Sequence, residues 1–117
     1  MSPPRPGEAG GPAEPGGVLA AMADPTRRQL LARLAASGSA TATELAGNLP
    51  VTRQAIAKHL AVLSRAGLVT SERHGRDVRF VVLTGGLTST AGWLDALAAE
   101  SDISRLVTIK PVAETPD

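Results

Sequence analysis

The side chains best suited to chemistry in this chain are polar and basic, and they gather at the start of one predicted helix. Arg53 can pair with the edge of a guanine, and Gln54 can pair bidentately with an adenine. Ala57 is small enough to allow close approach, and Lys58 lies on the outward face of the same helix. Thr52, at the predicted start of the helix, suits a phosphate. These residue types at this spacing predict contacts with double-stranded DNA.

A second basic group lies in a predicted hairpin, the wing, at residues 68–83. Its strands, Leu68–Arg73 and Val78–Leu83, are rich in β-branched residues and flank a polar turn. As a wing, this hairpin would lie along the sugar–phosphate backbone and supply affinity rather than sequence information. A solvated hairpin turn is the alternative interpretation. The predicted tip carries three residues able to bind phosphate: Arg73, His74 and Arg76.

The charge of the chain is unevenly distributed. Residues 51–80 carry two acidic side chains and six basic ones, namely Arg53, Lys58, Arg65, Arg73, Arg76 and Arg79. Their net charge is therefore +4, whereas the whole chain has a formal net charge of only +1 and the remainder carries −3. One acidic body with one basic patch is what a polyanion-binding module requires. Charge alone does not separate this interpretation from a solvated charged face.

The helix predicted over residues 52–66 positions the first group of side chains. At about 100° per residue, Ile56, Leu60 and Leu63 fall on one side and face the core. The opposite side is polar and includes Arg65, which completes the predicted DNA-binding set. An ordinary surface helix would look similar. The place of the 52–66 helix in the chain favours DNA binding, because the second helix of a helix-turn-helix enters the major groove by its N-terminal end.

Three shorter helices are predicted before it. A short helix over Val18–Ala23 precedes one that begins at Asp24 and ends at Gly38, since Asp caps helices and Gly ends them. The third begins at a capping box formed by Thr41 and Glu44.

The last predicted helix, Leu87–Ala99, has an apolar stripe of about 160°, wider than one packing contact requires. We expect one edge of the stripe to cover the domain and the other to meet a second copy of the chain. A dimer also suits DNA, since a two-fold protein reads two half-sites about one helical turn apart. A monomer that simply buries this helix is the alternative. The predicted interface comprises Val18, Leu19, Leu87, Ala91, Trp93, Leu94, Leu97 and Ala98.

Length and composition set the remaining limits. A chain of 117 residues has room for a single modest core. The first 17 residues, with five Pro and five Gly, predict a flexible arm, followed by the domain at 18–100 and a partly disordered extension at 101–117. Whether the last helix continues past Ser101 and Asp102 is left open by the sequence, because Ile103 falls on the polar side of the helix.

The sequence also excludes several classes of function. With Cys 0, the chain has no disulfide, thiolate metal site or cysteine nucleophile. No apolar run approaches the roughly 18 residues that cross a membrane, and without an apolar signal segment we expect a cytoplasmic protein. No nucleophile–base pair, phosphate loop or convergent carboxylates indicate an enzyme.

A family resemblance is carried by three segments: ADPTRRQLLARL, ATATELAGNLPVTRQAIAKHLAVLSRAGLV and ERHGRDVRF. They resemble the ArsR/SmtB family of winged-helix repressors over about residues 18–83. The resemblance implies a winged helix-turn-helix, mainly α with a small β-hairpin wing (α+β). It also implies a homodimeric bacterial transcriptional regulator that binds a palindromic operator and often represses its own operon. By position, residues 52–58 match the family's DNA-reading stretch, and Arg73, His74 and Arg76 match its wing tip.

The chain departs from the family pattern at positions where metal-sensing members carry their metal ligands. Arsenic-sensing members place a Cys pair where this chain has Glu44–Leu49, and zinc-sensing members carry Asp and His where this chain has only carboxylates. Such carboxylates, Asp95, Glu100 and Asp102, make a poor transition-metal site, so we predict no metal and no cofactor. Two alternatives stay open: a small-molecule effector near the dimer helices, and a winged-helix module that binds protein instead of DNA.

Overall fold

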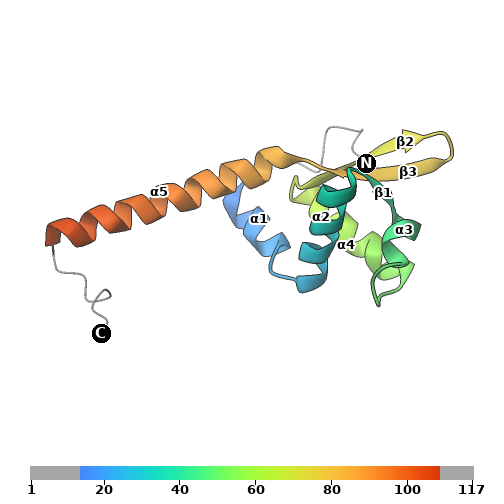
Figure 1. Cartoon of the computed structure of the whole chain (residues 1–117), viewed down its shortest axis with the longest axis horizontal. Helices are drawn as coiled ribbons and strands as arrows, with labels where there is room; N and C mark the ends of the chain where they lie inside the picture. The colour runs from blue at the N-terminus through green and yellow to red at the C-terminus, as the bar shows by residue number, and fades with distance from the viewer. Residues whose placement is uncertain (1–13, 109–117) are drawn as a thin grey trace.

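The computed structural model describes residues 14–108, and it is mainly helical with one small sheet (Figure 1). The predicted fold class, a winged helix-turn-helix with α+β content, is confirmed. The elements in chain order are α1 (Pro15–Ala21), α2 (Pro25–Ser37), β1 (Ala40–Thr41), α3 (Ala42–Ala46), α4 (Arg53–Arg65), β2 (Val69–His74), β3 (Asp77–Val82) and α5 (Thr84–Thr108).

The core is formed where α2 and α4 pack against each other and against the sheet. Ile56, Leu60 and Leu63, the predicted inner face of α4, are at most 2% exposed. They meet Leu30 and Leu34 of α2, which are equally buried. The helical spacing of these leucines gives each helix one apolar side, so the polar side of α4 is left facing outward.

The helix starts follow their capping residues. The side chain of Asp24 accepts hydrogen bonds from the backbone N–H of Thr26 at 2.7 Å and of Arg27 at 3.1 Å, and α2 ends at Gly38 with φ 88° as predicted. The capping box is also present, since Thr41 and Glu44 each accept the other's backbone N–H at 3.0 Å.

The first helix begins earlier than the sequence predicted. It starts at Pro15 rather than Val18 because the Glu14 carboxylate accepts the backbone N–H groups of Gly16 and Gly17, both at 3.2 Å. Pro15 occupies the first turn, where its missing N–H is harmless. The prediction of an arm through residue 17 was wrong for these last residues, and the rest of the predicted arm lies outside the described residues.

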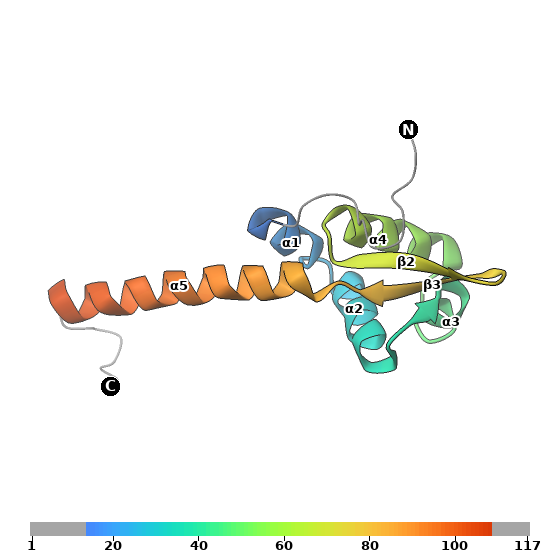
Figure 2. The same ribbon diagram turned by 90° about the horizontal axis from the view of Figure 1, so that it is seen from above.

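The sheet has three antiparallel strands in the order β1-β3-β2 (Figure 2). The hairpin of β2 and β3 is the predicted wing, and His74 pairs with Asp77 across a two-residue turn. Gly75 in this turn has φ 65°, a left-handed conformation that glycine adopts without strain. The strand β1, which pairs Ala40 with Phe80 and Thr41 with Arg79, was not predicted. Two residues are too few for an alternating pattern to reveal a strand.

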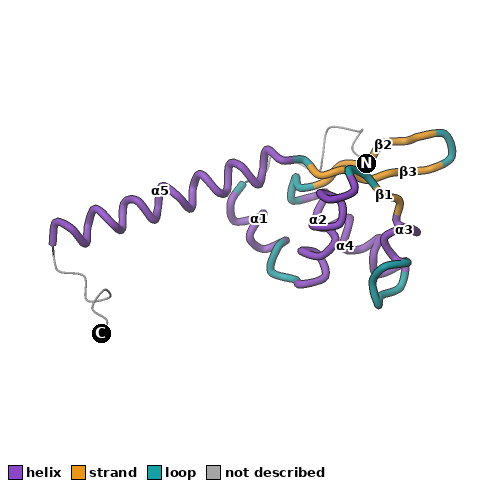
Figure 3. Tube along the Cα trace, viewed as in Figure 1, coloured by secondary structure: helices purple, strands orange, loops and turns teal. Residues whose placement is uncertain are grey.

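The last helix, α5, is longer than predicted and projects away from the other elements (Figures 1 and 3). It packs against α1 near its start, and residues 91–101 are all exposed. The sequence left open whether this helix passes Ser101, and in the structure α5 continues to Thr108. Ser and Asp disfavour a helix interior by only about 0.5 kcal/mol each, far less than Pro. No helix in the described part of the chain is long and apolar enough to cross a bilayer.

Candidate nucleic-acid interface

The outer surface of α4 begins with a group of exposed side chains, three of them polar. Arg53, Gln54, Ala57 and Lys58 are all exposed, whereas Ile56 between them is fully buried. The helix starts at its cap Thr52, whose hydroxyl accepts the backbone N–H of Ala55 at 3.0 Å. The capped end of α4 therefore presents these side chains to solvent, as a helix that enters the major groove would.

The wing carries its available cations at and near its tip. Arg73 and Arg76 are exposed, and neither takes part in an ion pair among residues 14–101, whose side chains the structure describes. His74 differs, because its Nε2 lies 3.2 Å from the carboxylate of Glu72 on the same strand. The two arginines are therefore the residues of the wing best able to contact phosphates.

A groove of about 580 Å³ joins the wing to the start of α4. Arg53 lines it from α4, and Arg76 lines it from the turn between β2 and β3. Its floor and edges come from α3 and β3, including Thr43 and Val78. These last two residues were not predicted, because nothing in their spacing indicated that α3 and β3 meet. The groove places one cation of α4 and one cation of the wing on the same open surface.

Arg65 is separated from this groove. It lies in the last turn of α4, about 18 Å along the helix from Arg53 at 1.5 Å per residue. A cation there is favourably placed against the partial negative charge of the helix C-terminus. The structure therefore places Arg65 on the same helix as Arg53 but not in the same groove.

The middle of α4 is tied to the helices behind it through His59. Its Nδ1 lies 3.4 Å from a guanidinium nitrogen of Arg27, and Arg27 Nε donates to the carbonyl of Ala21 at 2.6 Å. The backbone hydrogen bond from Arg27 lowers the pKa of Asp24, with smaller contributions from the N–H of Thr26 and from nearby His59. These contacts join α1, α2 and α4, so His59 ties α4 to the helices behind it.

The structure also locates the residues predicted to form a dimer interface. Leu19, Trp93, Leu94 and Leu97 are between 43% and 48% exposed, an unusual amount of open apolar surface. Val18 is only 1% exposed and belongs to the core of its own protomer, so it is unavailable to a partner. Leu87 is half-buried, whereas Ala91 and Ala98 are open.

Among the residues that the structure describes, no three His, Cys, Asp or Glu side chains lie close enough together to hold a metal ion.

The fold and this surface define a helix-turn-helix protein whose reading helix and wing are free to meet DNA. Comparisons with known proteins agree, since a helix-turn-helix domain family matches residues 22–72. An ArsR-like transcriptional regulator from Rhodococcus sp. RHA1 is 38% identical, with a TM-score of 0.71 over 82% of this chain and 93% of that one.

Proteins similar to this chain in sequence are also named transcriptional regulators. The HTH-type transcriptional regulator YuzN of Bacillus subtilis is 46% identical over 50% of this chain and 71% of its own length. The transcriptional repressor SdpR of the same species is 30% identical over 66% of this chain and 84% of its own length. The chain belongs to the ArsR/SmtB family of winged helix-turn-helix transcriptional regulators and is a DNA-binding regulator.

Proposed function

We propose that this regulator is a homodimeric repressor of the cytoplasm that binds a palindromic operator. In this proposal α4 enters the major groove, and the reading residues are Thr52, Arg53, Gln54, Ala57 and Lys58. Arg73, His74 and Arg76 of the wing contact the backbone, and Arg65 contacts it from the far end of α4. The observation that carries the proposal is the groove lined by both Arg53 and Arg76.

This groove supports simultaneous binding of base edges and backbone. A helix in the major groove is flanked by phosphates on both sides, so a wing beside its N-terminus meets the backbone without further movement. Arg53 and Gln54 supply base-specific hydrogen bonds, whereas the exposed arginines of the wing supply charge. The proposal thus assigns sequence choice to α4 and affinity to the wing.

The open apolar surface of α5 supports the homodimer. Trp93, Leu94 and Leu97 lie on a helix that projects beyond its own domain, with Leu19 of α1 also exposed. Monomeric proteins rarely leave apolar side chains of this size together in water. Pairing with a second copy would cover them and would place two reading helices for two half-sites.

A repressing role is supported by the relatedness to SdpR, which is named a transcriptional repressor. A dimer seated across a promoter would exclude polymerase by occupancy alone, without a further activity.

The proposal is tested by fluorescence anisotropy with DNA from upstream of the chain's own gene, at two salt concentrations. We expect nanomolar binding at low salt that falls steeply as salt rises, because several phosphates are neutralised. Specific retention of a palindromic fragment over a shuffled one would support the reading role of α4. No binding at low salt would favour the second candidate, a winged-helix module that binds protein.

A further inference from the structure

Arg79 is the one basic residue of the +4 segment that is not exposed. Its side chain is 26% exposed, whereas Arg53, Lys58, Arg65, Arg73 and Arg76 are all open to solvent. It lies on β3, between Thr41 of β1 on one side and Glu72 of β2 on the other. Nothing in the spacing of the basic residues separates it from the other arginines.

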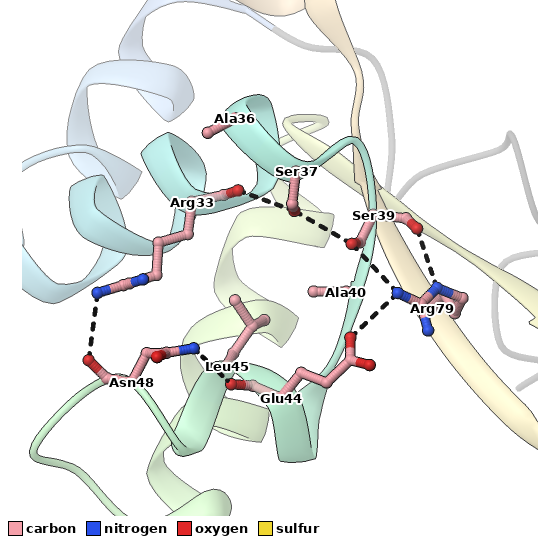
Figure 4. A pocket seen from close by; sticks show the side chains of 9 residues that line it. All are labelled: Arg33, Ala36, Ser37, Ser39, Ala40, Glu44, Leu45, Asn48 and Arg79. Carbon is pink, nitrogen blue, oxygen red and sulfur yellow. Dashed lines mark hydrogen bonds and ion pairs between the residues drawn. The ribbon is translucent and has the colours of Figure 1, made fainter.

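The guanidinium of Arg79 is held by groups outside the wing (Figure 4). Its Nε donates to the hydroxyl of Ser39 at 2.9 Å, and Nη2 donates to the carbonyl of Ser39 at 3.3 Å. Nη2 also donates to Oε1 of Glu44 at 3.0 Å, which forms an ion pair. A planar guanidinium can satisfy several acceptors at once in this way, whereas an ammonium cannot.

Glu44 is itself fixed by the start of α3. The same Oε1 accepts the backbone N–H of Thr41 at 3.0 Å as part of the capping box. This backbone hydrogen bond, together with the Arg79 guanidinium, lowers the pKa of the Glu44 carboxyl. The contact therefore links a strand of the wing to the capped end of α3.

The wing itself contains another carboxylate that could have paired with Arg79. Glu72 stands directly opposite Arg79 in the register, on the same face of the sheet. In the structure Glu72 contacts His74 instead, and Arg79 contacts Glu44. Pairing with Glu72 would have joined the wing only to itself, whereas pairing with Glu44 joins it to the helical domain.

Arg79 lies at the point along β3 where pairing with β1 ends. Arg79 and Phe80 are the residues of β3 that pair with β1. Beyond Arg79, toward the tip, β3 pairs only with β2 among the described strands, so the outer hairpin has no other strand beside it there. The side chain of Arg79 thus holds the wing about halfway along the hairpin, three residues after Arg76.

We infer that Arg79 is a positioning residue that fixes the wing to α3 and so holds Arg76 at the edge of the groove that Arg53 lines. The inference rests on the proposed function for the role of Arg76. It assigns to Arg79 no contact with phosphate, although the residue is as basic as its neighbours. Without the link the hairpin stays intact but its tip occupies more orientations, which weakens DNA binding.

The test compares Arg79→Gln with Arg76→Gln, since each removes one cation from the same hairpin. Anisotropy titrations over a series of KCl concentrations give both the affinity and its salt dependence. For Arg76→Gln we expect the slope of log K against log salt to become shallower by about 0.9 for each phosphate that is no longer neutralised. For Arg79→Gln we expect affinity to fall roughly three- to tenfold with the slope unchanged.

Two further variants separate positioning from charge. Glu44→Gln breaks the ion pair without removing a cation, and we expect it to weaken binding like Arg79→Gln. Arg79→Lys keeps the charge but not the planar fork, so we expect it to restore only part of the affinity. A slope that becomes shallower in Arg79→Gln as it does in Arg76→Gln would overturn the inference, because Arg79 would then contact DNA.

Amide hydrogen exchange on the unbound protein provides a readout that does not depend on DNA. We expect Arg79→Gln to speed exchange in the outer wing, at His74 and Asp77, whose amides face each other across the hairpin, while the core amide of Leu60 stays protected. Equal acceleration at all three would overturn the inference by showing a loss of global stability, and unchanged exchange in the wing would refute the link. If the wild-type chain bound no DNA, the proposed function would fail, whereas this exchange comparison would still test the link.

Discussion

Removing part of one exposed leucine tests the proposed dimer most directly. Leu97 is 48% exposed on the projecting part of α5, so about half of its side chain is available to a partner. Leu97→Ala deletes three carbons, at about 0.8 kcal/mol for each one fully buried. Halving that value for the exposed share gives about 1.2 kcal/mol per protomer and about 2.4 kcal/mol per symmetric dimer. The dimer dissociation constant should therefore rise about 50-fold.

Sedimentation equilibrium on the full chain measures this constant. Trp93 supplies a second readout, because it is the single Trp of the sequence and is 47% exposed, so its emission should shift to shorter wavelength as dimers form. Asp95→Ala is the matched control, since at 100° per residue it lies on the opposite side of α5 from Leu97. Alanine is a good helix former, so neither change should unfold α5.

If Leu97→Ala left the dissociation constant unchanged while Asp95→Ala raised it, the contact face of α5 would be the polar one. A wild-type chain that stayed monomeric at the highest concentrations would instead show that this apolar surface has another role.

Three other predictions concern the reading helix, the core and the capping box. Gln54→Ala should reduce the preference for one base at one position of each half-site by about 1–3 kcal/mol. Competition among operator variants that differ by a single base measures this preference. If binding to all of these variants weakened equally, Gln54 would contact the DNA backbone instead. Leu60→Ala should lower the free energy of unfolding by about 2–5 kcal/mol in urea, because Leu60 is 2% exposed and leaves a cavity; a change below about 1 kcal/mol would contradict this packing. In the folded chain the pKa of Glu44 lies below its ordinary value of 4.5. Its ionised carboxylate therefore stabilises the folded chain above pH 4.5, and this stability is lost as the pH falls through the pKa of the folded state. The wild type should therefore have a higher Tm than Glu44→Gln at neutral pH, and the two should converge in acid; a constant difference would exclude this linkage.

Local signals in the sequence predicted most of the helices. Asp24 and Gly38 bound α2 as expected, because capping and left-handed φ are properties of a few consecutive residues. The same holds for the capping box of Thr41 and Glu44, and for Thr52 at the start of α4. The outward face of α4 was also predictable, since three buried residues at helical spacing leave only one orientation.

Features that depend on distant segments were not predictable. β1 exists because Ala40 and Thr41 lie beside β3, and their own pattern contains no strand signal. The groove lined by Arg53 and Arg76 likewise joins residues far apart in the chain. The start of α1 was missed for a local reason, because Glu14 was treated as part of a Pro- and Gly-rich arm and not as a cap.

The order of the elements, the polar start of α4 and the basic character of the segment 51–80 are all properties of the amino-acid sequence alone. Which of those basic residues remain available to a ligand depends on how the elements pack. Arg76 and Arg79 are three residues apart and chemically identical, yet one is exposed at the turn and the other is bound to Ser39 and Glu44. The physical reason is that an ion pair depends on which carboxylate the fold brings within about 4 Å, and that distance is set by packing between segments rather than by spacing along the chain.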